Sequence, residues 1–182
     1  MHWWLKRKTQ MNNINLPPYT SFPTVYNNKI TLRQIQSSDV IDIIEISFYD
    51  AIQAKNLEQA IEMNSKINKD YEDGNSIHWG IADNQTNRIV GTCGYYRGFE
   101  NDKGELGCVL LPQFRGQGFM TQAMQLAIDF GLEKMKLKQI YAVTSQQNQK
   151  AIQLLERLQF KKTQDLEDND VEFQFNPILQ PI

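Results

Sequence analysis

Short stretches of alternating apolar and polar residues recur along the chain, and longer stretches repeat apolar residues at helical spacing. Ile30 and Leu32 alternate with polar neighbours, which predicts a strand over residues 29–35. Residues 119–135 repeat apolar side chains every three or four positions, which predicts a long helix. By the same criteria we expect further strands at 78–82, 89–96, 105–111, 139–144, 160–166 and 171–175, and further helices at 40–48, 56–71 and 148–158.

The order of these elements defines a fold class. A strand and two helices precede an antiparallel meander, and a strand–helix–strand–helix run and a closing hairpin follow. A helix between the strands at 105–111 and 139–144 implies a right-handed parallel crossover. We therefore expect an α/β (α+β) fold, with one mixed central sheet of about seven strands and about four flanking helices. In the helix at 56–71, Leu57 and Ile61 are expected to face the core.

The two ends of the chain lack a clear period. Residues 1–28 are rich in Asn, Pro and Thr, and their prolines disfavour regular structure, so we expect a tail or an extended arm there. Residues 29–176 are then the single folded domain, and residues 177–182 are a C-terminal tail.

Composition narrows the possible functions. The net charge of −2 gives no global field that favours nucleic acid or a membrane, and no apolar run is long enough to span a bilayer. Cys93 and Cys108 lack metal-ligand spacing and are interpreted as two buried small side chains, with a redox pair across adjacent strands left open. The absence of a signal peptide and of a disulfide framework favours a reducing cytoplasm. No metal site is expected.

Charge is distributed unevenly. Residues 37–83 contain ten acidic and three basic residues, a net charge of −7. Residues 113–162 contain eight basic and three acidic residues, a net charge of +5. Two ordinary solvated surfaces would explain this, and so would one face for an anionic cofactor and another for a cationic acceptor.

The segment 113–120 connects a strand to the long helix through two glycines, Gly116 and Gly118. Pro112 ends the strand because it has no N–H to donate. The first N–H groups of a helix are unpaired and carry partial positive charge, so this loop is a candidate anion site, with phosphate as the usual guest. A tight turn without a ligand is the alternative. Thr121 breaks the dinucleotide-binding glycine pattern, and no P-loop occurs.

The segment 113–120 as a whole is a more specific family signature than its two glycines alone. Gln113-x-x-Gly116-x-Gly118 resembles the signature of the GNAT superfamily of N-acetyltransferases. Other segments resemble the RimJ/RimL-like branch of that family in the same order, so that the resemblance covers about residues 23–175. These segments are Ile30–Arg33 followed by Asp39, Arg88–Gly94, Glu105–Gly107, and Asn148 followed by Leu155–Phe160.

The resemblance implies a cosubstrate and its binding residues. In the GNAT fold two parallel strands splay apart, the pantetheine of acetyl-CoA enters the gap, and the loop holds the pyrophosphate. Strand N–H groups near Val109 and Leu110 would face the thioester, and Asn148 would bind the pantetheine, although a plain helix cap explains Asn148 equally well. The cofactor-binding residues expected here are Val109, Leu110, Leu111, Gln113, Arg115, Gly116, Gln117, Gly118, Phe119, Met120 and Asn148.

The resemblance also suggests catalytic residues. Glu105 stands where the family often places a carboxylate and is our candidate general base. The usual proton donors are replaced by Ala151 and Leu155, so water or Tyr141 is left to protonate the thiolate. Tyr95 and Tyr96 are candidates for the acceptor cleft, although strand aromatics more often pack in the core. His78 is expected to be a packed histidine.

We therefore expect an acetyl-CoA-dependent N-acetyltransferase that acts by direct attack of a primary amine on the thioester. The acceptor is either a protein or peptide N-terminus or a small cationic amine, and the protein is a monomer or homodimer. Two alternatives stay open. One is a catalytically silent acyl-CoA-binding module, because Gln122, Ala151 and Leu155 depart from the family pattern. The other is a phosphate-loop protein that binds a different nucleotide.

Overall fold

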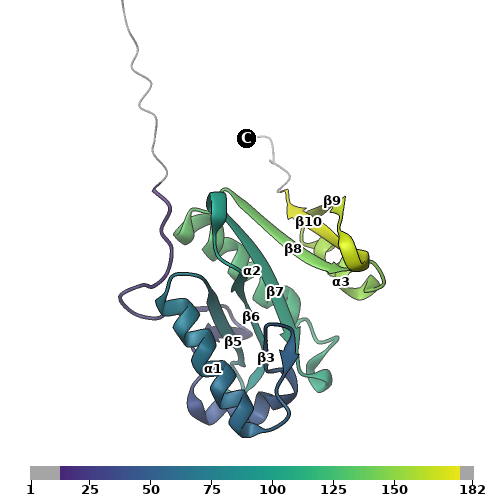
Figure 1. The fold of residues 1–182 in the computed structure, drawn as a ribbon. Helices are drawn as coiled ribbons and strands as arrows, with labels where there is room; N and C mark the ends of the chain where they lie inside the picture. Colours follow the sequence, from purple (N-terminus) through teal and green to yellow (C-terminus); the bar gives the residue numbers. More distant parts are fainter. Residues whose placement is uncertain (1–12, 177–182) are drawn as a thin grey trace, which may run out of the picture.

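A large twisted sheet forms the centre of the computed structural model, which describes residues 13–176 (Figure 1). Residues 1–12 and the tail predicted at 177–182 lie outside the described residues. The sheet has eight strands in the order β1-β2-β5-β6-β7-β8-β10-β9. Their bounds are β1 Val25–Tyr26, β2 Ile30–Arg33, β5 Ile77–Asp83, β6 Ile89–Tyr96, β7 Lys103–Leu110, β8 Gln139–Ser145, β9 Phe160–Asp165 and β10 Asp170–Phe175.

Helices cover both faces of the sheet. The 3-10 helix η1 (Ser37–Ile46) and α1 (Leu57–Glu72) lie on one face, and α2 (Phe119–Phe130) lies on the other (Figure 1). α3 (Gln149–Arg157) packs beside β9. Buried side chains form one core cluster that includes the α2 side and a smaller one under η1 and α1. The remaining elements are the hairpin of β3 (Phe48–Tyr49) and β4 (Ile52–Gln53), the 3-10 turns η2 (Glu100–Asp102), η3 (Pro112–Phe114) and η5 (Glu167–Asn169), and the π-helical turn η4 (Gly131–Met135).

Strands β7 and β8 are the parallel pair that positions the candidate site. They pair over three positions only, from Lys103 with Gln139 to Glu105 with Tyr141. β7 continues to Leu110 and β8 to Ser145 without further pairing, so the two strands separate beyond Glu105. All other pairs in the sheet are antiparallel. This mixed sheet with a splayed parallel pair confirms the predicted fold class.

Several predicted boundaries were wrong. The helix expected at 40–48 is a 3-10 helix that ends at Ile46, and Phe48 begins a strand instead. Its sequence is rich in isoleucine, whose branched side chain is restricted in a helix, and Ile43 has a non-helical backbone (φ −122°, ψ 16°). In α1, Leu57 and Ile61 are 37% and 49% exposed rather than inward, because the helix is rotated so that Ala60 faces the core.

The long helix expected at 119–135 changes to a π-helical turn after Phe130. The change occurs at Gly131, where an added Cβ would lie 2.2 Å from the Tyr95 hydroxyl oxygen. Tyr95 is fully buried and donates a hydrogen bond to the Ala127 carbonyl oxygen at 2.8 Å. The tyrosine therefore joins β6 to the end of α2.

We expect Tyr95→Phe to lower the free energy of unfolding by about 1 kcal/mol, because one buried hydrogen bond is lost while the Ala127 carbonyl keeps its helical partners. Urea denaturation measures the change. Tyr26→Phe is the control, since Tyr26 is 74% exposed and should leave the midpoint unchanged. Equal midpoints for wild type and Tyr95→Phe would contradict the prediction.

Residues 13–28 pack against the domain. The Asn15 N–H donates to the Met135 carbonyl oxygen at 2.9 Å, and the Trp79 Nε1–H donates to the Pro23 carbonyl oxygen at 2.9 Å. β1 adds an eighth strand to the seven expected, because Val25 and Tyr26 pair with β2. Among residues 13–176 there is no helix with both the length and the apolar composition needed to cross a bilayer.

Candidate active site

Glu105 and Tyr141 come together where β7 and β8 separate. They are the last paired residues of the two strands, and the Tyr141 hydroxyl lies 3.4 Å from Glu105 Oε2, at the long limit of a hydrogen bond. The Glu105 side chain is 14% exposed. The two residues that the sequence suggested for catalysis, 36 positions apart in the chain, thus form one cluster at the base of the gap.

Arg97 is a third member of this cluster and was missed by the sequence analysis. Its Nη1 donates to Glu105 Oε1 at 2.9 Å and to Oε2 at 3.1 Å. It follows the end of β6, where Tyr96 is the cross-strand partner of Glu105. A hairpin with Arg and Glu at offset positions is a common surface pattern, so the sequence carried no distinctive signal for this pair.

The environment of Tyr141 keeps its phenol protonated. Burial raises the pKa of Tyr141 above its ordinary value of 10.0, and the negative charge and hydrogen bond of Glu105 raise it further. The Tyr141 hydroxyl therefore carries its proton throughout the neutral range.

The backbone of β7 offers N–H groups to the gap. The Leu111 N–H donates to the Val90 carbonyl oxygen at 3.0 Å, so it is already used within the sheet. N–H directions alternate along an antiparallel pair, which points Val109 toward β6 and leaves Cys108 and Leu110 pointing away from it, toward the gap. Of the N–H groups expected near Val109 and Leu110, that of Leu110 faces the gap and that of Val109 faces β6. The N–H of Cys108, which the sequence analysis did not name, also faces the gap.

The loop 113–120 forms the open, left-handed turn that its glycines predicted. Gly116 and Gly118 have φ of 73° and 80°, and Gly118 is the residue that begins α2. An added Cβ would meet nothing within 4 Å at Gly116 and only Lys29 Nζ, at 3.9 Å, at Gly118. The loop backbone is thus accessible to an anion, and Gln113 to Gly118 are exposed apart from Phe114.

The side chains near the loop differ in the groups they could provide to a bound anion. Phe119 is buried and Met120 is half-buried, so their contribution to a bound anion is limited to backbone N–H groups. Arg115 folds back to the Leu110 carbonyl oxygen, with Nη2 at 3.3 Å and Nε at 3.4 Å. Lys29, from the loop before β2, donates to the Gln117 carbonyl oxygen and lies 4.7 Å above the Phe119 ring. It adds a positive charge that the sequence analysis missed, because 88 residues separate it from Gln117.

Asn148 is the helix cap that the alternative interpretation expected. Its Oδ1 accepts a hydrogen bond from the Ala151 N–H at 3.2 Å at the start of α3. The residue is exposed, so the NH₂ of its side-chain amide is accessible beside the end of β8.

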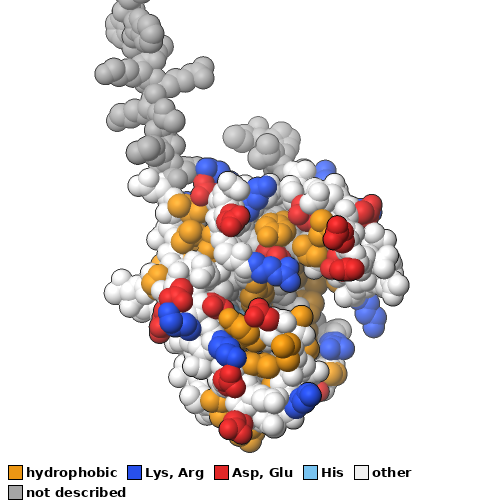
Figure 2. Space-filling view, viewed as in Figure 1, with side chains coloured by type: hydrophobic (Ala, Val, Ile, Leu, Met, Phe, Trp, Pro, Cys, Tyr) orange, Lys and Arg blue, Asp and Glu red, His pale blue; other side chains and the backbone are white. Residues whose placement is uncertain are grey.

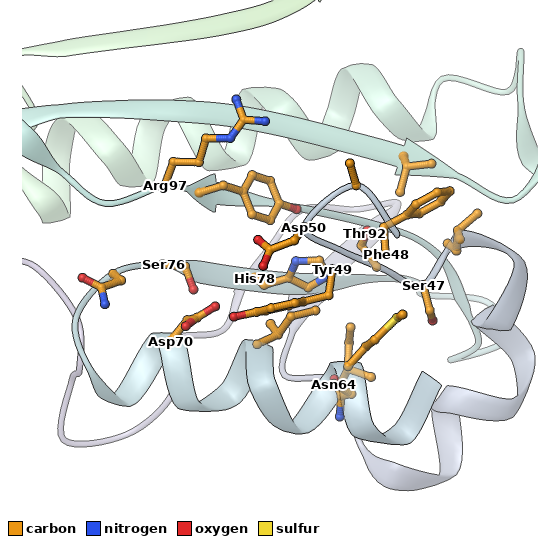
Figure 3. Close-up of a pocket in the computed structure, with 18 of the residues that line it drawn as sticks. Ser47, Phe48, Tyr49, Asp50, Asn64, Asp70, Ser76, His78, Thr92 and Arg97 are labelled. Carbon is orange, nitrogen blue, oxygen red and sulfur yellow. The ribbon is translucent and has the colours of Figure 1, made fainter. Parts of the chain in front are cut away.

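A cavity of about 730 Å³ lies between the sheet and the layer made by η1, the β3–β4 hairpin and α1 (Figure 3). Tyr96 and Val109 line it, whereas Tyr95 is in the core on the opposite face. His78 also lines it. Although part of the residue is solvent-accessible, its Nδ1 is completely buried, and burial lowers the pKa of His78 to about 4. The histidine is therefore packed and neutral, as expected, but it faces a cavity.

The two cysteines are direct cross-strand partners on β6 and β7, and both are free thiols. Cys93 is fully buried and Cys108 partly so. Within the described residues, no three His, Cys, Asp or Glu side chains gather in an arrangement that could hold a metal ion.

A splayed parallel pair, an open loop at a helix start and a cavity beside them are the features of an acyl-CoA-dependent transferase. Comparison with known proteins agrees: residues 29–161 match the family described as acetyltransferase (GNAT) domain. The chain is 30% identical over 154 residues to the uncharacterized N-acetyltransferase p20 of Bacillus licheniformis, covering 80% of this chain and 86% of that protein.

Solved structures share the fold. A Vibrio cholerae protein provisionally assigned as a ribosomal-protein-serine acetyltransferase superposes with a TM-score of 0.73 at 17% identity, over 85% of this chain and 97% of that one. A dodecameric spermidine N-acetyltransferase from Vibrio cholerae superposes with a TM-score of 0.67 at 19% identity, over 81% of this chain and 92% of that one. The chain belongs to the GNAT acetyltransferase family and is an acetyl-CoA-dependent acetyltransferase.

Proposed function

We propose that the chain transfers an acetyl group from acetyl-CoA to a primary amine at the point where β7 and β8 separate. The meeting of Glu105 and Tyr141 at this point is the observation that carries the proposal. The pyrophosphate would lie on the loop 113–118 and the first N–H groups of α2, near Lys29 and Arg115, and the pantetheine would follow β7 into the gap toward Asn148.

Different residues of this chain would perform the separate steps of acetyl transfer. The N–H groups of Cys108 and Leu110 would stabilise the oxyanion that forms when the amine nitrogen attacks the thioester carbon. Glu105, directly or through a water, would take the proton that the nitrogen loses, and Tyr141 would give its proton to the departing thiolate. The contact between Tyr141 and Glu105 would then return the proton from the carboxyl group to the phenolate, which restores both groups.

The acceptor would enter from the cavity. Tyr96 and Arg97 line the cavity and adjoin Glu105 across the strands, so an amine in the cavity reaches the base without crossing the sheet. This route is compatible with two kinds of acceptor. One is a protein or peptide N-terminus, as in RimJ/RimL-like enzymes. The other is a small amine, as the name of the spermidine N-acetyltransferase suggests. The free cysteines agree with a cytoplasmic location. We expect a monomer or homodimer.

Thiol release from acetyl-CoA in the presence of an amine panel tests the proposal. Saturable thiol release with at least one primary amine, and acetylated product in the mass spectrum, is expected. Binding of acetyl-CoA with no release for any amine or peptide would instead favour the silent acyl-CoA-binding module. Competition by ATP as strong as that by CoA would favour a different nucleotide on the loop.

Tyr141→Phe is expected to lower kcat about tenfold, less than a full general-acid effect, because a thiolate is a good leaving group. Since the pKa of Tyr141 is raised, the phenol does not titrate in the neutral range, and the ratio of wild-type to variant kcat should be constant from about pH 6 to 9. Steady-state rates across this range measure it. A ratio of wild-type to variant kcat that falls toward 1 within this pH range would show that Tyr141 is not the proton donor.

A further inference from the structure

Among the described residues, three carboxylates line the cavity without a salt bridge of their own, although Lys66 and Lys69 of α1 interact electrostatically with Asp50 and Asp70. Asp50, Asp70 and Glu100 line it, and none of the three has a salt-bridge partner within 4.0 Å among residues 13–176. Arg97 is the cationic side chain in the lining, and its guanidinium is already paired with Glu105. On the face shown in Figure 2, acidic, basic and hydrophobic side chains are intermixed, and no single-sign patch covers this face.

Two buried polar atoms of the lining have no partner within the described part of the chain. Ser76 is only 7% exposed, and its Oγ is buried without a hydrogen bond. His78 Nδ1 is buried without a hydrogen bond as well. Buried polar atoms are nearly always hydrogen-bonded, so two orphaned atoms on residues that line one cavity are candidates to bond a polar ligand there.

These groups are arranged along the cavity. Figure 3 shows Ser76 beside Asp70 at one end, His78 between Asp50 and Tyr49 in the middle, and Thr92 toward the other end. The Asp70 carboxylate, together with burial and Asp50, raises the pKa of the Tyr49 phenol. Val109 of β7, the strand that would present the thioester, also lines the cavity. One part of the cavity thus adjoins the proposed reaction centre and another part carries carboxylates.

We propose that the acceptor has two amines: one reacts near β7, and a second, protonated amine binds among Asp50, Asp70 and Ser76. This inference rests on the proposed function and names its substrate class as an aliphatic diamine or polyamine, or another small molecule with spaced amino groups. The attacking amine must be neutral, whereas an ammonium group is a pure donor and suits carboxylate and hydroxyl oxygens. Because His78 is neutral, it does not repel the second charge.

A peptide N-terminus fits this lining less well. The peptide backbone following the N-terminal amine presents N–H groups and carbonyl oxygens in equal number, and the carboxylates of Asp50, Asp70 and Glu100 can accept from the N–H groups but cannot donate to the carbonyl oxygens. Burying carbonyl groups against unpaired carboxylates would cost free energy. The observations therefore favour a small cationic acceptor over a peptide.

Steady-state acetylation of 1,5-diaminopentane and 1-aminopentane tests the inference, because the two amines have the same chain length and differ in the second charge. We expect kcat/KM to be about 10–100-fold higher for the diamine, the range given by one hydrogen-bonded charge pair. Spermidine and kanamycin, measured alongside, distinguish a linear polyamine from an aminosugar as the source of the spaced amines. An alanine-initiated hexapeptide represents the peptide acceptor.

Asp70→Asn and Asp50→Asn should each raise KM for the diamine about tenfold and leave the rate with 1-aminopentane within about twofold. Asp50 has a φ of 48°, which asparagine tolerates, so this variant keeps the hairpin even if Asp70→Asn is unstable. Asp73→Asn is the matched control, since Asp73 ends α1 outside the cavity and pairs with Lys69.

The outcomes separate this inference from the proposed function. Equal or better rates with 1-aminopentane or the hexapeptide than with the diamine would overturn the diamine inference and leave amine acetylation standing. Unchanged diamine KM in both aspartate variants would do the same. No product from any amine or peptide would overturn both.

Discussion

Gly118→Trp is expected to weaken acetyl-CoA binding by about 100-fold or more, because the variant removes the anion site in two ways. Gly118 has a φ of 80°, a conformation that costs a residue with a side chain about 1 kcal/mol or more. The indole would also occupy the open space at the first turn of α2, where the unpaired N–H groups and the helix dipole favour the pyrophosphate. Isothermal titration calorimetry with acetyl-CoA measures the loss.

Gly98→Trp is the matched control for this experiment. Gly98 has a φ of 81° and open space around its Cα, so the substitution imposes the same backbone strain away from the loop. The control should bind acetyl-CoA with wild-type affinity. Wild-type affinity in Gly118→Trp as well would place the cosubstrate elsewhere on the molecule.

Glu105→Gln is expected to lower kcat by about 10²–10⁴-fold, the usual contribution of a positioned general base. Glutamine keeps the size of the side chain but cannot take a proton from the attacking amine. It also removes the ion pair with Arg97, which is 73% exposed and can turn to water. Thiol release with a saturating amine measures kcat, and calorimetry confirms that acetyl-CoA still binds.

Glu133→Gln controls for the loss of a negative charge, because Glu133 is an exposed glutamate beyond α2 and remote from the cluster. Its kcat should match that of the wild type. A wild-type kcat for Glu105→Gln would show that Glu105 is not the general base. The rate enhancement would then have to come from positioning of the amine.

The fold class and the open conformation of the loop 113–118 were predictable because their signals are local. A strand, Pro112, two glycines and an apolar helix follow one another within about 30 residues, and the left-handed turns at Gly116 and Gly118 require glycine. The predictions at Leu57 and Ile61 failed because periodicity defines a helix face but not the neighbour toward which the helix is rotated. The helix expected at 40–48 is present as the 3-10 helix Ser37–Ile46, but its end was wrong, because the apolar Phe48 fits the helical spacing and a strand equally well.

The amino-acid sequence by itself determined the order of elements, the strand–loop–helix with its open glycine loop, and Glu105 and Tyr141 as candidates. Only the tertiary structure decided that these two residues meet, since the three-position register of β7 and β8 ends at them. It also decided that Arg97 pairs with Glu105, that Lys29 reaches the loop, and that Asp50 and Asp70 line one cavity. The contacts of Glu105 with Tyr141 and of Lys29 with Gln117 join residues far apart in the chain. The geometry of all these contacts follows from strand register and helix rotation, which no local pattern encodes.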